Sequence, residues 1–368
     1  MARIFGRDYE KRDLMKLVGD ISQVAGMKKY ELSEGKGRGV RAVDVWTGTG
    51  LYFTISLERA MDISWASYFG KSLCWRSSNG DVHPHFYEPE GLRWLRSFFG
   101  GLLTTCGLTY AGAPCEDQGE ELGLHGRISH APAEKVSLDE RWEGNDYLLS
   151  VKGLMRESVV FGENITLRRC IRTRLGESRL WIHDVVENEG FKKTPFMIVY
   201  HINGGFPAVA KGSRLISPTL EITPRDKEAE EGKEDYHKFT SPIPYFKEKV
   251  YYHKMKEDSS GLVHCALVNE DIEEGGFGFY VKYKKEQLPQ FIEWKMTGEG
   301  DYVVGMEPAN CLVEGRDKER ERGALKFLEP GEKKEFDLEI GVLAGKESIE
   351  EFKKLISVDK VRIKSFKP

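Results

Sequence analysis

The sequence has 368 residues with 55 Lys and Arg against 59 Asp and Glu, a formal net charge of −4. This near balance gives no electrostatic reason to expect a nucleic-acid partner. No window approaches the roughly 18 consecutive apolar residues that a membrane-spanning helix needs. The charged N-terminus lacks the apolar core of a signal peptide. Six scattered cysteines without a CxxC pair are typical of reduced thiols. We therefore expect a cytoplasmic protein.

The first segment predicts a helix. Residues 8–20 carry apolar side chains at i, i+3, i+4 and i+7, and Gly26 can end the segment. These apolar positions are Leu14, Leu17, Val18 and Ile21.

From about Gly37 the pattern changes to short runs of β-forming residues separated by Gly, Asn or Asp. The runs predict strands at residues 40–46, 51–57, 146–153, 164–175, 179–188, 194–203, 261–269, 277–283, 290–296, 301–307 and 335–343. Helical patterns interrupt them only at residues 90–103 and 348–356.

Many strands with few helices predict an all-β fold of two packed, mainly antiparallel sheets. No linker rich in Pro, Gly or Ser divides the chain, so residues 1–368 are interpreted as one domain. Within it, residues 1–37 form an N-terminal helix and lead-in, residues 38–345 the β-sandwich, and residues 346–368 a C-terminal helix and tail.

Polar residues interrupt the apolar strand at residues 194–203. Alternation places Phe196, Ile198, Tyr200 and Ile202 on one face and Met197, Val199, His201 and Asn203 on the other. Both faces are apolar until His201 and Asn203. The pattern indicates either the floor of a polar pocket or a structural histidine bonded to the backbone.

The strand at residues 301–307 has the same character. Val303, Gly305 and Glu307 share one face, and Pro308 is expected to stop the ladder. Glu307 is therefore either a functional carboxylate or a turn partner.

The segment Leu122–Ser129 places His125, Gly126 and Arg127 in succession. Glycine allows close backbone approach to a ligand, and arginine presents a planar fork of donors. His83 and His85 have a spacing that can bind metal, but no third ligand stands nearby, so no metal site is expected.

Together, several segments resemble the aldose 1-epimerase-like branch of the galactose mutarotase superfamily. These segments are GGLLTTCGLTYAGAP (100–114), LHGRISHAPAE (124–134), FGENITLRR (161–169), DVVENEG (184–190), YHINGGFP (200–207), GMEPANCLVEGR (305–316) and LEPGEKKEFDLEIGVLAG (328–345). The resemblance implies a galactose mutarotase-like β-supersandwich with a few short helices and a sugar bound in a cleft on one sheet.

The resemblance also implies roles for residues. Glu307 takes the proton of the anomeric hydroxyl, and His201 protonates the ring oxygen. His125 and Arg127 bind sugar hydroxyls, with Asn203 in the same pocket. Trp294 either stacks on the sugar or is part of the core.

Ring opening needs one group that accepts a proton and one that donates it, so no cofactor is required. By analogy with carboxylate pairs that flank a sugar, we expect the Glu307 carboxylate and the His201 imidazole to lie roughly 5–9 Å apart. We expect all four of His125, Arg127, His201 and Glu307 in one concave pocket.

The expected partner is a small carbohydrate, and the expected activity is an isomerase that interconverts anomers or epimers of a monosaccharide or sugar derivative. The H-I-N spacing and the lack of a matching aspartate depart from galactose mutarotases and leave the sugar open. Two other functions are compatible with the fold: a non-catalytic sugar-binding protein and a lyase-type carbohydrate enzyme. The sequence does not indicate an oligomeric state.

Overall fold

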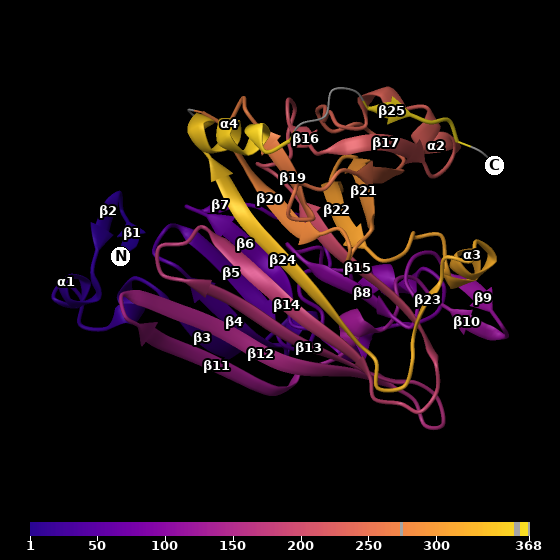
Figure 1. The fold of residues 1–368 in the computed structure, drawn as a ribbon, viewed down its shortest axis with the longest axis horizontal. Coiled ribbons are helices and arrows are strands. Elements are labelled where there is room, and N and C mark those ends of the chain that lie inside the picture. Colours follow the sequence, from indigo (N-terminus) through magenta and orange to yellow (C-terminus); the bar gives the residue numbers. More distant parts are fainter. Residues whose placement is uncertain (273–274, 357–360, 367–368) are drawn as a thin grey trace.

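The computed structural model describes residues 1–272, 275–356 and 361–366. Three larger sheets dominate the fold, and nearly all of their strand pairs are antiparallel (Figure 1). The predicted all-β fold class is confirmed.

One sheet, called the long sheet below, has eight strands taken from the middle and the C-terminal part of the chain. In spatial order they are β11 (Glu134–Glu143), β12 (Asp146–Ser158), β13 (Asn164–Arg174), β14 (Arg179–Asn188), β24 (Lys333–Ala344), β20 (Phe277–Lys284), β19 (Leu262–Asn269) and β16 (Arg214–Ile216).

A second sheet carries the candidate site. Its order is β23 (Lys326–Leu328), β15 (Thr194–Gly204), β22 (Tyr302–Ala309), β21 (Gln290–Thr297), β18 (Lys249–Met255), β17 (Thr219–Pro224) and β25 (Arg362–Ile363), and β8 (Thr104–Leu108) also pairs with β15.

The N-terminal part forms a third sheet and two small ribbons. The sheet consists of β3 (Gly26–Glu31), β4 (Arg41–Trp46), β5 (Leu51–Ser56), β6 (Asp62–Tyr68) and β7 (Lys71–Ser72). The ribbons pair β1 (Ala2–Ile4) with β2 (Arg7–Tyr9) and β9 (Cys115–Asp117) with β10 (Glu120–Leu122). Because β3 joins this sheet, the β-structure begins before residue 38, within the predicted lead-in.

The helices are short: α1 (Lys11–Met15), α2 (Lys227–Glu230), α3 (Arg316–Glu321) and α4 (Lys346–Lys354). The prediction at residues 348–356 is confirmed by α4. The predicted tail falls partly on residues 357–360 and 367–368, which lie outside the described residues. No helix of the described residues is long and apolar enough to cross a membrane.

Two predicted helices are wrong in extent. At residues 8–20 only α1 forms as a helix. Leu14 is the one fully buried side chain of the predicted apolar set, Leu17 stays 64% exposed, and so short a helix has little stability of its own. At residues 90–103 only a 3-10 turn forms, at Arg93–Ser97, and the left-handed φ angles of Gly100 and Gly101 end the segment.

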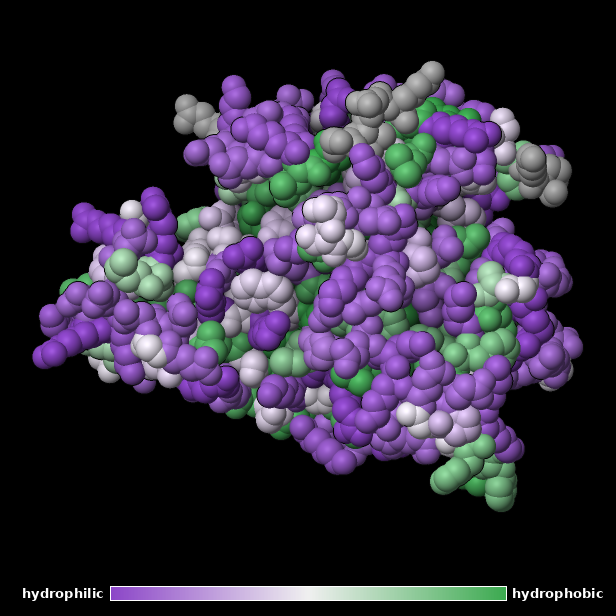
Figure 2. All heavy atoms as spheres, viewed as in Figure 1, coloured by the Kyte–Doolittle hydropathy of each residue, from purple (hydrophilic) through white to green (hydrophobic). Residues whose placement is uncertain are grey.

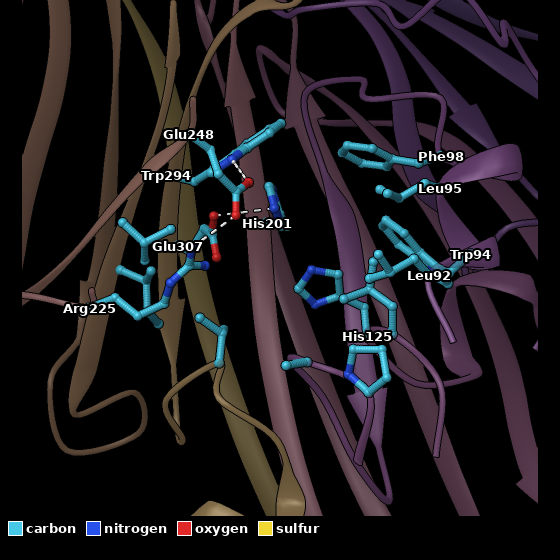
Figure 3. Close-up of a pocket in the computed structure, with 16 residues that line it drawn as sticks. Leu92, Trp94, Leu95, Phe98, His125, His201, Arg225, Glu248, Trp294 and Glu307 are labelled. Atoms are coloured by element: carbon cyan, nitrogen blue, oxygen red, sulfur yellow. Dashed lines mark hydrogen bonds and ion pairs between the residues drawn. The ribbon is translucent and has the colours of Figure 1, made fainter. Parts of the chain in front are cut away.

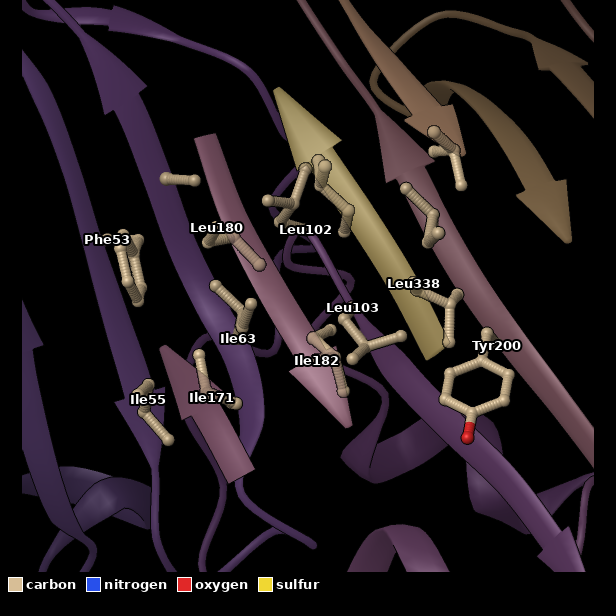
Figure 4. Close-up of a cluster of buried hydrophobic side chains, with 14 of the residues drawn as sticks. Phe53, Ile55, Ile63, Leu102, Leu103, Ile171, Leu180, Ile182, Tyr200 and Leu338 are labelled. Atoms are coloured by element: carbon tan, nitrogen blue, oxygen red, sulfur yellow. The ribbon is translucent and has the colours of Figure 1, made fainter. Parts of the chain in front are cut away.

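The main hydrophobic cluster lies between the long sheet and its neighbours (Figure 4). It contains Phe196, Ile198, Tyr200 and Ile202 from one face of β15, as the alternation predicts. The other face of β15 gives Met197 and Val199 to a second cluster. Both faces of β15 are therefore buried, while hydrophilic side chains cover most of the visible outer surface (Figure 2). All six cysteines are free thiols.

A buried arginine connects these sheets. Arg169 on β13 contacts Asp184 on β14 at 2.7 Å and Asp62 on β6 at 2.8 Å, and none of the three side chains is exposed to solvent. Thr105 on β8 donates to Asp62, and the Tyr200 hydroxyl on β15 donates to Asp184. Burial alone would lower the pKa of Arg169, but Asp184 and Asp62 raise it, so the guanidinium stays charged.

We predict that Arg169→Met lowers the free energy of unfolding by about 3–5 kcal/mol, because it leaves Asp62 and Asp184 buried without their cation. Denaturant unfolding at pH 7 measures the change. The matched control is Arg168→Met on the same strand, whose side chain is 47% exposed and pairs with Glu189. Arg168→Met should lower the free energy of unfolding by less than about 1 kcal/mol. Equal losses in the two variants would contradict the role given to Arg169.

Candidate active site

His201 and Glu307 stand opposite each other on the neighbouring strands β15 and β22. Val199 pairs with Ala309 and Ile202 pairs with Met306, and this register places His201 across from Glu307. Proline has no N–H to donate, which accounts for a local gap in this ladder at Pro308. The strand does not stop there, as the sequence suggested, because Pro308 still pairs with Phe291 on β21.

The two side chains are in direct contact. His201 Nε2 lies 3.2 Å from Glu307 Oε1, and both residues are buried. The expected separation of 5–9 Å is wrong. Opposite residues on paired strands have neighbouring Cβ atoms, so the two groups lie side by side instead of on either side of a sugar ring.

Gly305 provides the space for this contact. A Cβ atom added at Gly305 would lie 2.5 Å from Glu307 Oε1 and 3.3 Å from the His201 ring. It would also lie 3.0 Å from Cβ of Trp294, the residue of the neighbouring strand β21 that pairs with Gly305. Any larger residue would therefore move the carboxylate away from the imidazole.

The apolar surroundings favour the neutral forms of the pair. Burial raises the pKa of Glu307 well above its ordinary 4.5, Glu248 adds to the rise, and Arg225 opposes it. Burial lowers the pKa of His201 to about 3, His125 adds to the fall, and Asn203 opposes it. Both shifts oppose a charged carboxylate beside a charged imidazolium, so burial favours the form of the pair in which Glu307 carries the proton.

His125 approaches the same place from a loop. Its ring centroid lies 5.7 Å from that of His201 and 5.0 Å from that of Trp94. Its φ angle of 58° is left-handed, and burial lowers its pKa to about 4. The following residue must be glycine, because a Cβ at Gly126 would lie 2.2 Å from the Gly107 carbonyl oxygen. The glycine predicted to approach a ligand thus packs against backbone.

Arg59 holds the loops around the cavity. Its guanidinium is buried and donates to the carbonyls of Ser129, Val82 and Ser97. The Ser129 hydroxyl in turn accepts from the Trp94 indole at 2.9 Å. The network thus holds Trp94, which lines the cavity beside His125, from behind.

Two charged residues of the site were missed by the sequence analysis. Arg225 follows β17 and Glu248 precedes β18, and they contact each other at 3.0 Å. Glu248 also accepts a hydrogen bond of 2.8 Å from the Trp294 indole. Both stand in charged loop segments that look like ordinary surface, and no local pattern distinguishes them.

These residues surround one cavity of about 380 Å³ (Figure 3). It is lined by His125, His201, Trp294 and Glu307 from the sequence prediction, by Arg225 and Glu248, and by an apolar set. The apolar set consists of Leu92, Trp94, Leu95, Phe98, Ala113, Pro114, Leu124, Val250, Ile292 and Val313.

Arg127 and Asn203 do not line this cavity. Arg127 lies over the Tyr110 ring, 4.9 Å from its centroid, and contacts Glu120 at 3.5 Å beside a separate surface pocket. Asn203 is buried and its amide donates to the His201 carbonyl at 3.0 Å. The expected convergence of four residues thus leaves out Arg127.

We predict that Gly305→Ala lengthens the contact between His201 Nε2 and Glu307 Oε1 beyond hydrogen-bond distance. A crystal structure of the variant measures the distance, and denaturant unfolding checks that the fold persists. The matched control is Gly19→Ala, because a Cβ atom at Gly19 meets nothing within 4 Å. A folded Gly305→Ala protein with an unchanged contact would contradict the role of this glycine.

Comparison with known proteins places the chain in a family. A family described as a domain of unknown function (DUF4432) matches residues 37–342. The chain belongs to the DUF4432 family. None of the curated proteins matches its sequence.

Solved structures confirm the predicted galactose mutarotase-like fold of this DUF4432 protein. A candidate aldose 1-epimerase from Klebsiella pneumoniae subsp. pneumoniae MGH 78578 is 25% identical, covers 94% of this chain and 93% of its own, and has a TM-score of 0.88. A galactose mutarotase-like protein from Clostridium acetobutylicum is 11% identical over 87% of this chain and 99% of its own, with a TM-score of 0.58. A galactose 1-epimerase from Lactobacillus acidophilus NCFM is 13% identical over 87% of this chain and 99% of its own, with a TM-score of 0.52.

Proposed function

We propose that this DUF4432 protein is a cytosolic isomerase of the aldose 1-epimerase type, which interconverts the anomers of a free monosaccharide or sugar derivative. The observation that carries the proposal is the buried contact of 3.2 Å between His201 and Glu307 in the wall of a cavity. An acid and a base that share one proton beside a binding cavity suit the opening and closing of a sugar ring.

The proposed reaction begins with one transfer inside the pair. Moving the Glu307 proton to His201 Nε2 gives a carboxylate next to an imidazolium. The carboxylate then takes the proton of the anomeric hydroxyl, and the imidazolium gives its proton to the ring oxygen. The bond between C1 and the ring oxygen breaks as the C1 carbonyl forms.

Rotation about C1–C2 turns the aldehyde over, and the same transfers in reverse close the ring on the other face. After ring opening the pair is left as neutral Glu307 and neutral His201, which are the forms that burial favours. The burial that makes the first transfer unfavourable therefore stabilises the pair at the open-chain stage.

The other cavity residues are assigned to binding. His125 Nδ1 is buried without a hydrogen-bond partner, so it is free to bond a sugar hydroxyl. Trp294 presents its ring next to His201 at a centroid distance of 5.4 Å, where it can cover the apolar face of a pyranose. Asn203 acts indirectly by holding the backbone of His201, and Arg127 is assigned no role in binding the sugar.

A sugar-binding protein without turnover is the alternative. Binding needs hydrogen-bond groups but no transfer of a proton. Removing the acid–base group of Glu307 therefore abolishes the activity of an isomerase, whereas a binding protein has no such activity to lose. Both functions need the cavity.

We predict that Glu307→Gln lowers the rate of anomer exchange by about 10²–10⁴-fold while sugar binding is largely kept, because the amide preserves the shape and removes the acid–base group. NMR exchange spectroscopy over a panel of aldoses, ketoses and uronates measures the rate, and titration calorimetry measures the binding. The control is Glu187→Gln on β14, away from the cavity. Wild-type exchange in Glu307→Gln would contradict the mechanism, and binding without exchange in the unmodified protein would favour the alternative.

A further inference from the structure

The two walls of the cavity differ in chemistry. Figure 3 shows Arg225, Glu248, Trp294, Glu307 and His201 on the side of the sheet, and an apolar group from the segment at residues 92–98 across from them. This segment, which we call the leucine wall, contributes Leu92, Trp94, Leu95 and Phe98.

The leucine wall exposes apolar surface toward the cavity. Leu92 is 60% exposed and Leu95 is 48% exposed, although both line the cavity. Large apolar side chains left open beside a ligand site are typical of surface that a ligand covers.

The four side chains of the wall offer no free hydrogen-bond group, and several of its backbone carbonyls are engaged. The Trp94 indole is committed to Ser129, the Leu95 carbonyl accepts from Asn79 at 2.8 Å, and the Trp94 carbonyl accepts from Ser97. The Leu92 carbonyl accepts from the Leu95 amide. A sugar hydroxyl turned toward this wall would lose its water without a replacement.

The position of the wall indicates which part of the sugar meets it. In the proposed mechanism His201 protonates the ring oxygen, and the Phe98 ring lies 5.6 Å from the His201 ring, centroid to centroid. In a hexopyranose the ring oxygen is bonded to C5, which carries the exocyclic C6. The anomeric hydroxyl is held at Glu307 on the sheet side of the cavity, and C1 and C5 lie on either side of the ring oxygen. C5 and its C6 group are therefore directed away from Glu307, toward the wall that contains Phe98 and Leu95.

We infer that the substrate is a sugar whose exocyclic group is apolar, a 6-deoxyhexose being the simplest member of the class. The inference rests on the proposed function, which sets the orientation of the ring. A methyl substituent on C5 covers Leu95 and Phe98 and needs no hydrogen-bond partner. The hydroxyl of a hydroxymethyl group would be buried there without a hydrogen bond.

The test compares three sugars that share their ring configuration. Each series contains a 6-deoxyhexose, its parent hexose and the pentose that lacks C6. Suitable sets are 6-deoxy-D-glucose, D-glucose and D-xylose; D-fucose, D-galactose and L-arabinose; and D-rhamnose, D-mannose and D-lyxose. Dissociation constants come from titration calorimetry, and anomer exchange rates come from NMR, both on the full-length protein.

In at least one series the 6-deoxyhexose should bind roughly tenfold more tightly than the parent hexose, since an unpaired buried hydroxyl costs about that factor. It should also bind more tightly than the pentose, which lacks the methyl group. Leu95→Asn should reduce the difference in affinity between the 6-deoxyhexose and the parent hexose, because the amide supplies a hydrogen-bond partner for the C6 hydroxyl. Leu17→Asn, at a leucine 64% exposed outside the cavity, should leave it unchanged.

Binding decides this inference, and exchange decides the proposed function. A parent hexose that binds as well as its 6-deoxy counterpart in every series overturns the inference, even if anomer exchange is fast. No binding of any of the nine sugars also overturns it. A clear 6-deoxy preference without any exchange supports the inference about the wall and contradicts the isomerase.

Discussion

One buried cation holds together the strands on which the site depends. Arg169 bridges Asp62 and Asp184, and Tyr200 joins the same network from β15. Tyr200 and His201 are consecutive, so their side chains leave opposite faces of the strand. The Tyr200 hydroxyl is held by Asp184, the partner of Arg169, so the position of β15 is fixed from this face. The position of His201 on the opposite face, where it contacts Glu307, is fixed with it.

The site is a polar pair set in an apolar environment. On the face of β15 that carries His201, the neighbouring side chains of Met197 and Val199 belong to a hydrophobic cluster. Such surroundings disfavour both the carboxylate and the imidazolium. The buried pair of His253 and Glu293 is equally close, but His201 and Glu307 line this cavity and the other pair does not. Perturbed groups beside a cavity are candidates for acid–base chemistry. The same apolar environment continues into the leucine wall on the other side of the cavity.

Local sequence patterns predicted much of the fold and part of the site. Alternation alone placed His201 and Glu307 on the inner faces of doubly buried strands. The distance predicted between their side chains was wrong, because this distance depends on the register between β15 and β22, which the sequence of one strand does not determine. Arg225 and Glu248 were missed because they flank strands whose pairing brings distant loops together. The helix predicted at residues 90–103 does not form over that length, because Gly100 and Gly101 adopt left-handed φ angles. Part of this segment forms the apolar wall of the cavity instead.

The central claim is that His201 and Glu307 work as one proton-sharing unit. A double-mutant cycle of His201→Asn and Glu307→Gln, read by the rate of anomer exchange, tests it most directly. Groups that act as a unit are strongly non-additive. If the two residues act as a unit, each single variant loses nearly as much rate as the double variant. Rate losses that add on a logarithmic scale would contradict it, because the two residues would then act independently.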